Sequence, residues 1–119
     1  MASVDVVIPV YNEKHVLAQS VATLRQFLSK GFHHKWRILI ADNASTEGTL
    51  AVAQELAQKH ANVASLHIPE KGRGRALKAS WLGSAADIVS YMDVDLSTEL
   101  AAFPLLIEAI ASEGYHIAT

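Results

Sequence analysis

A chain of 119 residues, 50% of them hydrophobic, has the size and apolar content of one globular domain with a buried core. Its formal net charge of −2 argues against a general nucleic-acid-binding protein, which would carry a clustered excess of Lys and Arg. The lack of cysteine excludes a disulfide framework and a thiolate metal site, and fits a reducing compartment. No apolar run approaches the roughly 20 residues of a membrane span, and no secretory signal opens the chain. We therefore expect one soluble domain over residues 1–119.

Short runs of apolar, β-branched residues recur along the chain, and helical patterns separate them. Nearly continuous runs of this kind are typical of strands buried on both faces of a parallel sheet. The expected strands are Val4–Ile8, Ile38–Ala41, Val63–Ile68 and Ile88–Met92. Because strands and helices alternate, we expect right-handed crossovers and a Rossmann-like α/β/α sandwich around a mostly parallel sheet.

The first helix is expected from about Glu13 to Lys30, with Asn12 as its N-cap and Gly31 as its stop. Apolar residues at spacings of three and four predict the stripe that packs on the sheet: Leu17, Val21, Leu24 and Leu28.

Three further helices are expected. The second starts at a Ser45 or Thr46 cap and runs toward His60. A third follows Gly74, and the last begins at Pro104 and ends at Gly114. The chain then ends inside an expected strand after Tyr115, which is typical of the amino-terminal portion of a longer protein.

Asp93 and Asp95 directly follow the apolar run that ends at Met92. Both would lie at the carboxyl end of a strand, where open α/β sheets bind ligands. An Asp-x-Asp pair is weak on its own, because solvated loops often contain one. In this context, paired carboxylates suit Mg²⁺ or Mn²⁺, which prefer oxygen ligands and bridge to substrate phosphates.

The first strand is followed by Tyr11 and Glu13, which come after Pro9 at the edge where ligands bind. From these residues alone we favour an ordinary strand exit, with Asn12 as a helix cap and Tyr11 and Glu13 as surface residues. Asp42 closes the second strand in the same way, and its carboxylate can accept a hydrogen bond from a nucleobase N–H.

A basic, glycine-containing segment precedes the third expected helix, with Lys71 and Arg73 around Gly72 and Gly74. It lacks the ending of a Walker loop and does not follow the first strand as a Rossmann loop would. It reads either as a flexible basic loop or as a diphosphate site, in which the glycines allow close backbone approach and Lys71 and Arg73 supply positive charge.

Four segments carry a resemblance to a known family: Pro9 to Glu13, the turn that begins at Asp42, the basic segment with Lys71 and Arg73, and the Asp93–Asp95 pair. In order and spacing they resemble glycosyltransferase family 2, nearest to the polyprenyl-phosphate (dolichyl-phosphate) glucosyl- and mannosyltransferases. The resemblance implies a GT-A fold, truncated here, whose donor-binding part occupies residues 1–119. It places Pro9, Tyr11 and Glu13 against the base and ribose of a nucleotide-diphosphate sugar. This chain differs from the family's pattern at two places. The family's usual Asp-Asp-Gly-Ser is Asp42-Asn43-Ala44-Ser45 here, and Ser97 replaces a Gln that joins the metal shell. Metal ligation and helix capping by Ser97 remain equal alternatives.

The function implied by this resemblance is metal-dependent, inverting transfer of a sugar from a UDP- or GDP-sugar to a polyprenyl phosphate or a saccharide acceptor. Asp93 would also face the ribose or a metal-bound water. No residue is assigned as a catalytic base, and sugar transfer by this chain alone is not expected. The implied location is cytoplasmic, at the cytoplasmic face of the membrane in the full-length protein.

Two alternatives stay open, and the sequence argues against a third. A non-catalytic nucleotide-sugar-binding module and an inactive truncated fragment, self-associating through an exposed sheet edge, share these motifs. A sugar-phosphate nucleotidyltransferase would require a Gly-rich block after the first strand, where this chain has Pro9-Val10-Tyr11-Asn12-Glu13.

Overall fold

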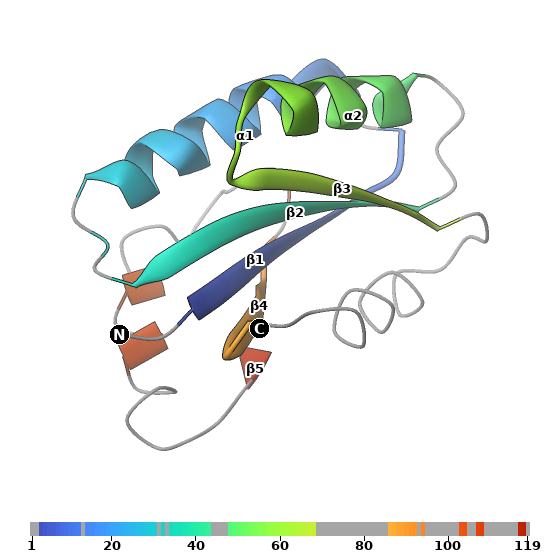
Figure 1. The fold of residues 1–119 in the computed structure, drawn as a ribbon. Coiled ribbons are helices and arrows are strands. Elements are labelled where there is room, and N and C mark those ends of the chain that lie inside the picture. The colour runs from blue at the N-terminus through green and yellow to red at the C-terminus, as the bar shows by residue number, and fades with distance from the viewer. Residues whose placement is uncertain are drawn as a thin grey trace.

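The computed structural model describes residues 3–12, 14–30, 32, 34–43, 48–68, 86–92, 94, 103–104, 107–108 and 117–118. These residues form an α/β fold with a parallel sheet (Figure 1). The strands are β1 (Ser3–Val10), β2 (Lys35–Asn43), β3 (Val63–Ile68), β4 (Ile88–Tyr91) and β5 (Ile117–Ala118). The helices are α1 (Lys14–Ser29) and α2 (Thr49–Lys59).

The strands are ordered β3-β2-β1-β4-β5, and every neighbouring pair is parallel. The chain moves from β1 outward through β2 to β3, then returns to place β4 on the other side of β1. The strand order therefore reverses beside β1. In open α/β sheets, such a reversal marks the crevice in which ligands bind at the carboxyl ends of the strands.

Helices α1 and α2 cover one face of the sheet (Figure 1). The predicted stripe of α1 is confirmed, because its four apolar residues are at most 1% exposed. They pack in one core cluster with β-branched residues from alternate strand positions, among them Val4, Val6, Ile8, Ile38 and Ile40. Every second residue of β1 and β2 thus faces the stripe that α1 presents at spacings of three and four, and burial on this face fixes the sheet register.

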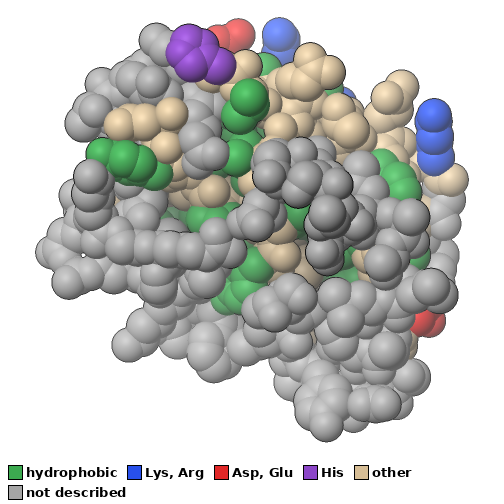
Figure 2. Space-filling model, turned by 180° about the vertical axis from the view of Figure 1, so that it is seen from behind, with side chains coloured by type: hydrophobic (Ala, Val, Ile, Leu, Met, Phe, Trp, Pro, Cys, Tyr) green, Lys and Arg blue, Asp and Glu red, His purple; other side chains and the backbone are tan. Residues whose placement is uncertain are grey.

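The opposite face carries a smaller core cluster of Val7, Leu39, Ala41, Ile68 and Val89. Seen from behind, hydrophobic side chains show in the middle of the described surface, while the visible charged and histidine side chains lie near its outline (Figure 2). Strands β1 and β2 are thus buried on both faces, as their nearly continuous apolar sequences predict.

The expected end of the first strand at Ile8, before Pro9, is wrong. Strand β1 continues to Val10, and Pro9 pairs with Ala41 of β2. In the described residues the register with β4 ends earlier, at Val7 opposite Tyr91. A proline has no N–H to donate, but here the ladder on the β4 side has already ended, so β1 tolerates it.

The predicted cap of the second helix needs correction. Helix α2 begins at Thr49, and its N-cap is Gly48 with φ 92°, not Ser45 or Thr46. The positive φ explains the choice, because glycine adopts it without the steric cost that a β-carbon brings. Helix α1 is described from Lys14, and Asn12, the predicted N-cap, has φ 52°.

Toward the end of the chain, the described residues 103–104 and 107–108 are helical, and Phe103 and Ile107 join the larger core cluster. The expected final strand is confirmed by β5, which pairs with β4. The helix expected after Gly74 lies outside the described residues. No helix in the described part of the chain is long and apolar enough to cross a membrane.

Candidate functional site at the carboxyl edge of the sheet

Three strands bring polar groups together where they end. Val10 of β1 lies opposite Asp42 of β2, and Asp42 lies opposite His67 of β3. Tyr11 follows Val10 directly and is 37% exposed. Because the strands are parallel, these residues form one row across the carboxyl edge of the sheet.

The centre of this row is the hydrogen-bonded pair of Asp42 and His67. The Asp42 side chain is completely buried, and its Oδ2 lies 2.8 Å from Nδ1 of His67, whose side chain is 42% exposed. An ionised carboxylate only accepts hydrogen bonds, so Nδ1 carries the hydrogen and donates it. The Asp42 hydrogen bond uses Nδ1, so Nε2 is the ring nitrogen of His67 that does not take part in it. The imidazole itself is partly open to solvent.

The second oxygen of Asp42 has a different environment. Oδ1 is buried and has no hydrogen-bond partner among the described residues. A buried acceptor without a partner typically costs about 1–3 kcal/mol. This cost marks Oδ1 as an atom that gains from a donor supplied by a ligand.

The backbone beside this row adopts an uncommon conformation. After β1, Asn12 takes φ 52°, in the left-handed region that non-glycine residues seldom occupy, although Asn does so more readily than most. Tyr11 precedes it, so the turn sets the direction in which the chain leaves the sheet edge. Residues in such conformations often cluster at ligand-binding sites.

The predicted metal-binding segment is anchored at its middle residue. Val94, between Asp93 and Asp95, is buried in the larger core cluster, and its carbonyl accepts a hydrogen bond from Ser20 Oγ of α1. Just before it, the Met92 N–H donates to the carbonyl of Val7 at 2.9 Å. The backbone is therefore held by β1 at Met92 and by α1 at Val94.

Tyr91 lies at the end of β4, immediately before this segment. Burial raises the pKa of its phenol above the ordinary value, because the charged phenolate is poorly solvated there. Tyr91 is accordingly a neutral hydroxyl at physiological pH and not a source of negative charge.

The structure places only some of the predicted site residues. Pro9, Tyr11 and Asp42 are described, and they lie on β1, just after β1 and on β2. Outside the described residues lie Glu13, Lys71, Arg73, Asp93 and Asp95. Among the residues that are described, no group of three or more acidic or histidine side chains is placed to hold a metal ion.

His67 was missed by the sequence interpretation. The run Val63–Ile68 was predicted as a buried strand, and His67 is its most polar member, next to its carboxyl end. A histidine beside the end of a predicted parallel strand was the available signal. Its partner depended on the register between β2 and β3, which only the structure supplies.

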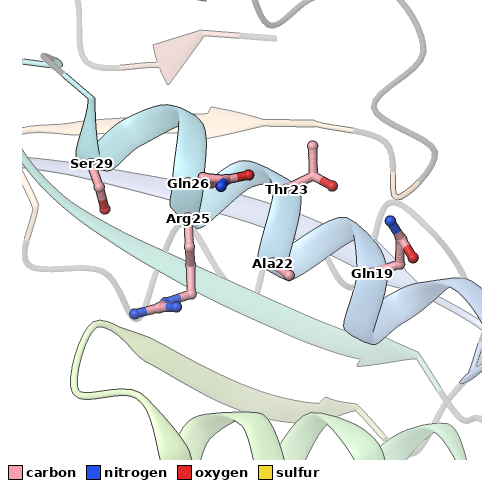
Figure 3. Close-up of a pocket in the computed structure, with 6 residues that line it drawn as sticks. All are labelled: Gln19, Ala22, Thr23, Arg25, Gln26 and Ser29. Atoms are coloured by element: carbon pink, nitrogen blue, oxygen red, sulfur yellow. The ribbon is translucent and has the colours of Figure 1, made fainter.

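An open surface depression of about 470 Å³ lies on α1, away from this row. It is lined by Gln19, Ala22, Thr23, Arg25, Gln26 and Ser29, all on that helix (Figure 3). Near it, the pKa of His60 is lowered by desolvation and by the positive charges of Arg25 and Lys59. None of these residues ends a strand, so the depression is separate from the candidate site.

The sequence profile of glycosyl transferase family 2 matches residues 5–119. The chain belongs to this family. A mannosyltransferase from Pyrobaculum calidifontis, solved in complex with GDP-Man and Mn²⁺, superimposes with a TM-score of 0.74. It is 22% identical, and the match covers 91% of this chain and 32% of that protein, which supports the GT-A type of fold.

Relatives in glycosyl transferase family 2 include polyprenyl-phosphate enzymes. A dolichyl-phosphate beta-glucosyltransferase of Trichomonas vaginalis is 29% identical over 87% of this chain and 33% of its own length. A dolichol-phosphate mannosyltransferase of Pyrococcus furiosus is 32% identical over 90% of this chain and 30% of its own length. An undecaprenyl-phosphate 4-deoxy-4-formamido-L-arabinose transferase of Pseudomonas savastanoi is 28% identical over 96% of this chain and 34% of its own length. The chain spans about a third of the length of these relatives.

Proposed function

We propose that this chain binds the nucleotide-diphosphate sugar donor of an inverting glycosyltransferase. The base and ribose lie along the carboxyl edge of β1 to β3, against Pro9, Tyr11 and Glu13, with Asp42 accepting from a base N–H. An aromatic face can stack on a base, and a carboxylate can accept from ribose hydroxyls. The relatives in glycosyl transferase family 2 support this assignment.

The observation that carries the proposal is the buried, half-satisfied carboxylate of Asp42. A carboxylate that served only to stabilise the fold would gain most by having both oxygens paired. One that receives a ligand must keep an acceptor available. Asp42 lies at the edge where open α/β sheets bind nucleotides, so a base N–H is the donor expected there.

The diphosphate is assigned to Lys71 and Arg73, with Asp93 and Asp95 as the ligands of a Mg²⁺ or Mn²⁺ ion. The donor set fits such a cation, because hard carboxylate oxygens flank a residue whose backbone Ser20 holds in place. The bound ion supplies stabilisation of the negative charge that develops on the leaving diphosphate. Lys71 and Arg73 add fixed positive charge to the same group.

In the proposed reaction, an acceptor oxygen bonds to the anomeric carbon as the bond from that carbon to the diphosphate oxygen breaks. The two oxygens lie on opposite faces of the sugar, which inverts the configuration. A phosphate acceptor is already anionic and needs no proton removed. We therefore assign no catalytic base among these residues.

A polyprenyl phosphate is the proposed acceptor, by analogy with the names of the relatives described above. Its lipid places the reaction at a membrane surface, and we assign the cytoplasmic face. The saccharide acceptor and the non-catalytic binding module are the alternatives, and a transfer assay with radiolabelled UDP- or GDP-sugar and polyprenyl phosphate separates them.

Calorimetry with UDP and GDP, with and without Mn²⁺, tests donor binding. We expect tighter binding with the ion present, because phosphate oxygens complete a coordination shell that two carboxylates fill only in part. Asp95→Ala should abolish the enhancement, whereas Glu55→Ala, an exposed acidic change on α2, should retain it. Equally tight binding of both nucleotides in a chelator would refute the metal site.

A further inference from the structure

We propose that His67 is a positioning residue for nucleobase recognition, which holds one oxygen of Asp42 so that the other faces a base N–H. This inference rests on the proposed function and adds to it a residue and a specificity. The ligand class is a nucleoside diphosphate whose base carries an imide-type N–H, as uracil and guanine do.

The geometry of the pair provides the first argument. His67 and Asp42 are direct neighbours across β2 and β3, and Nδ1 and Oδ2 lie 2.8 Å apart. A carboxylate held at one oxygen by a donor from a fixed strand position loses its freedom to rotate. Oδ1 is then kept in a single direction, which is the preorganisation that a recognition site needs.

Burial provides the second argument. Asp42 is fully buried, whereas the His67 side chain is 42% exposed, so the imidazole lies between the carboxylate and solvent. Oδ1 has no partner among the described residues. A desolvated acceptor of this kind rejects ligands that cannot donate to it far more strongly than a solvated acceptor does.

The hydrogen-bonding groups of the four bases decide which nucleotides a fixed acceptor at Oδ1 can select. Uracil has an N–H at ring position 3 and guanine an N–H at ring position 1, and a carboxylate oxygen accepts from either. Cytosine and adenine have unprotonated, accepting nitrogens at the corresponding positions. A fixed Oδ1 therefore repels the lone pairs of cytosine and adenine, and selects UDP or GDP over CDP and ADP.

Two substitutions at His67 separate positioning from other roles. In His67→Asn, the side-chain amide nitrogen takes the place of Nδ1 and still donates to Oδ2, but nothing replaces Nε2. His67→Leu keeps bulk and removes the donor. Binding of UDP, GDP, CDP and ADP to each variant is measured by calorimetry with Mn²⁺, and the fold of each is checked by thermal unfolding.

We expect the unaltered chain to prefer UDP or GDP over CDP and ADP by at least about tenfold, the lower range for one buried hydrogen bond. His67→Leu should lose most of this preference, and His67→Asn should retain it. If His67→Leu does not fold, His67→Gln replaces it: its amide lies where Nε2 was and not at Nδ1, so it too should lose the preference.

The outcomes distinguish the two proposals. If no nucleoside diphosphate binds the unaltered chain, the proposed function fails and this inference with it. If the unaltered chain binds and His67→Leu keeps the same preference, only the role of His67 is overturned. Equal loss in the Asn and Leu variants would mean that the ring itself contacts the base, which also overturns positioning.

Discussion

Two buried aspartates on neighbouring strands show how differently the same group is used in this sheet. Asp5 of β1 is 4% exposed, and Arg37 of β2 donates to both of its oxygens, from Nε at 3.1 Å and from Nη2 at 2.7 Å. Asp42, at the other end of β2, receives one hydrogen bond from the residues that the structure describes, from His67 at Oδ2.

Both carboxylates are paired across strands with the residue opposite them in register, Arg37 for Asp5 and His67 for Asp42. The difference is the number of oxygens used. A bidentate guanidinium pair satisfies a carboxylate fully, whereas a single imidazole N–H does not. Asp5 is therefore paired at both oxygens, whereas Oδ1 of Asp42 is without a partner among the described residues.

The largest effect on stability is expected from Arg37→Met, which keeps the apolar stem and removes the charge. It leaves the buried Asp5 without its bidentate donor and should lower the free energy of unfolding by about 2–3 kcal/mol, less than a fully buried pair because Arg37 is half exposed. Urea denaturation measures this. Nucleotide affinity of the folded protein should not change, and a loss below about 0.5 kcal/mol would contradict the structural role.

Asp42→Ala should show the opposite behaviour. Nucleotide binding should weaken by about 1–3 kcal/mol, the cost of leaving a buried base donor unpaired, while the metal enhancement persists. Stability should change less than in Arg37→Met, because the remaining partner, His67, is exposed enough to be hydrated. Unchanged affinity for both UDP and GDP would remove Asp42 from the site.

A smaller effect is expected from Ser20→Ala, which removes the hydrogen bond to the carbonyl of Val94. The change should reduce the Mn²⁺ enhancement of nucleotide binding by about 1 kcal/mol, the worth of one ordinary hydrogen bond. Ser29→Ala, at an exposed position of the same helix, is the matched control. Equal enhancement in both variants would show that Ser20 does not position the segment.

The fold followed from the sequence wherever burial was strong. Strand Val63–Ile68 was predicted with its observed bounds, and the apolar stripe of α1 is buried as expected. Errors arose where a single backbone angle decided the outcome. Ser45 and Thr46 have good capping side chains, but the chain enters α2 through the left-handed Gly48, which a preference for side-chain caps does not reveal.

The site was predictable only in part, for a similar reason. Asp42 was found because it follows an apolar run, and its place at the end of β2 is confirmed. Its partner depended on register, since a shift of β3 by one residue would place His67 on the other face of the sheet. Sequence alone could not show that one Asp42 oxygen is paired and the other is not.

The return of the chain to β4 has a consequence for how the protein folds. Asp42 and His67 are 25 positions apart in sequence, so their pair closes a loop of moderate length that contains α2. The pairing of Val4 with Ile88 joins segments that are distant in sequence, and closing so long a loop costs more entropy. We expect the Asp42–His67 contact to form first, and the contacts of Met92 with β1 and of Val94 with α1 to wait until the chain has returned to place β4 beside β1.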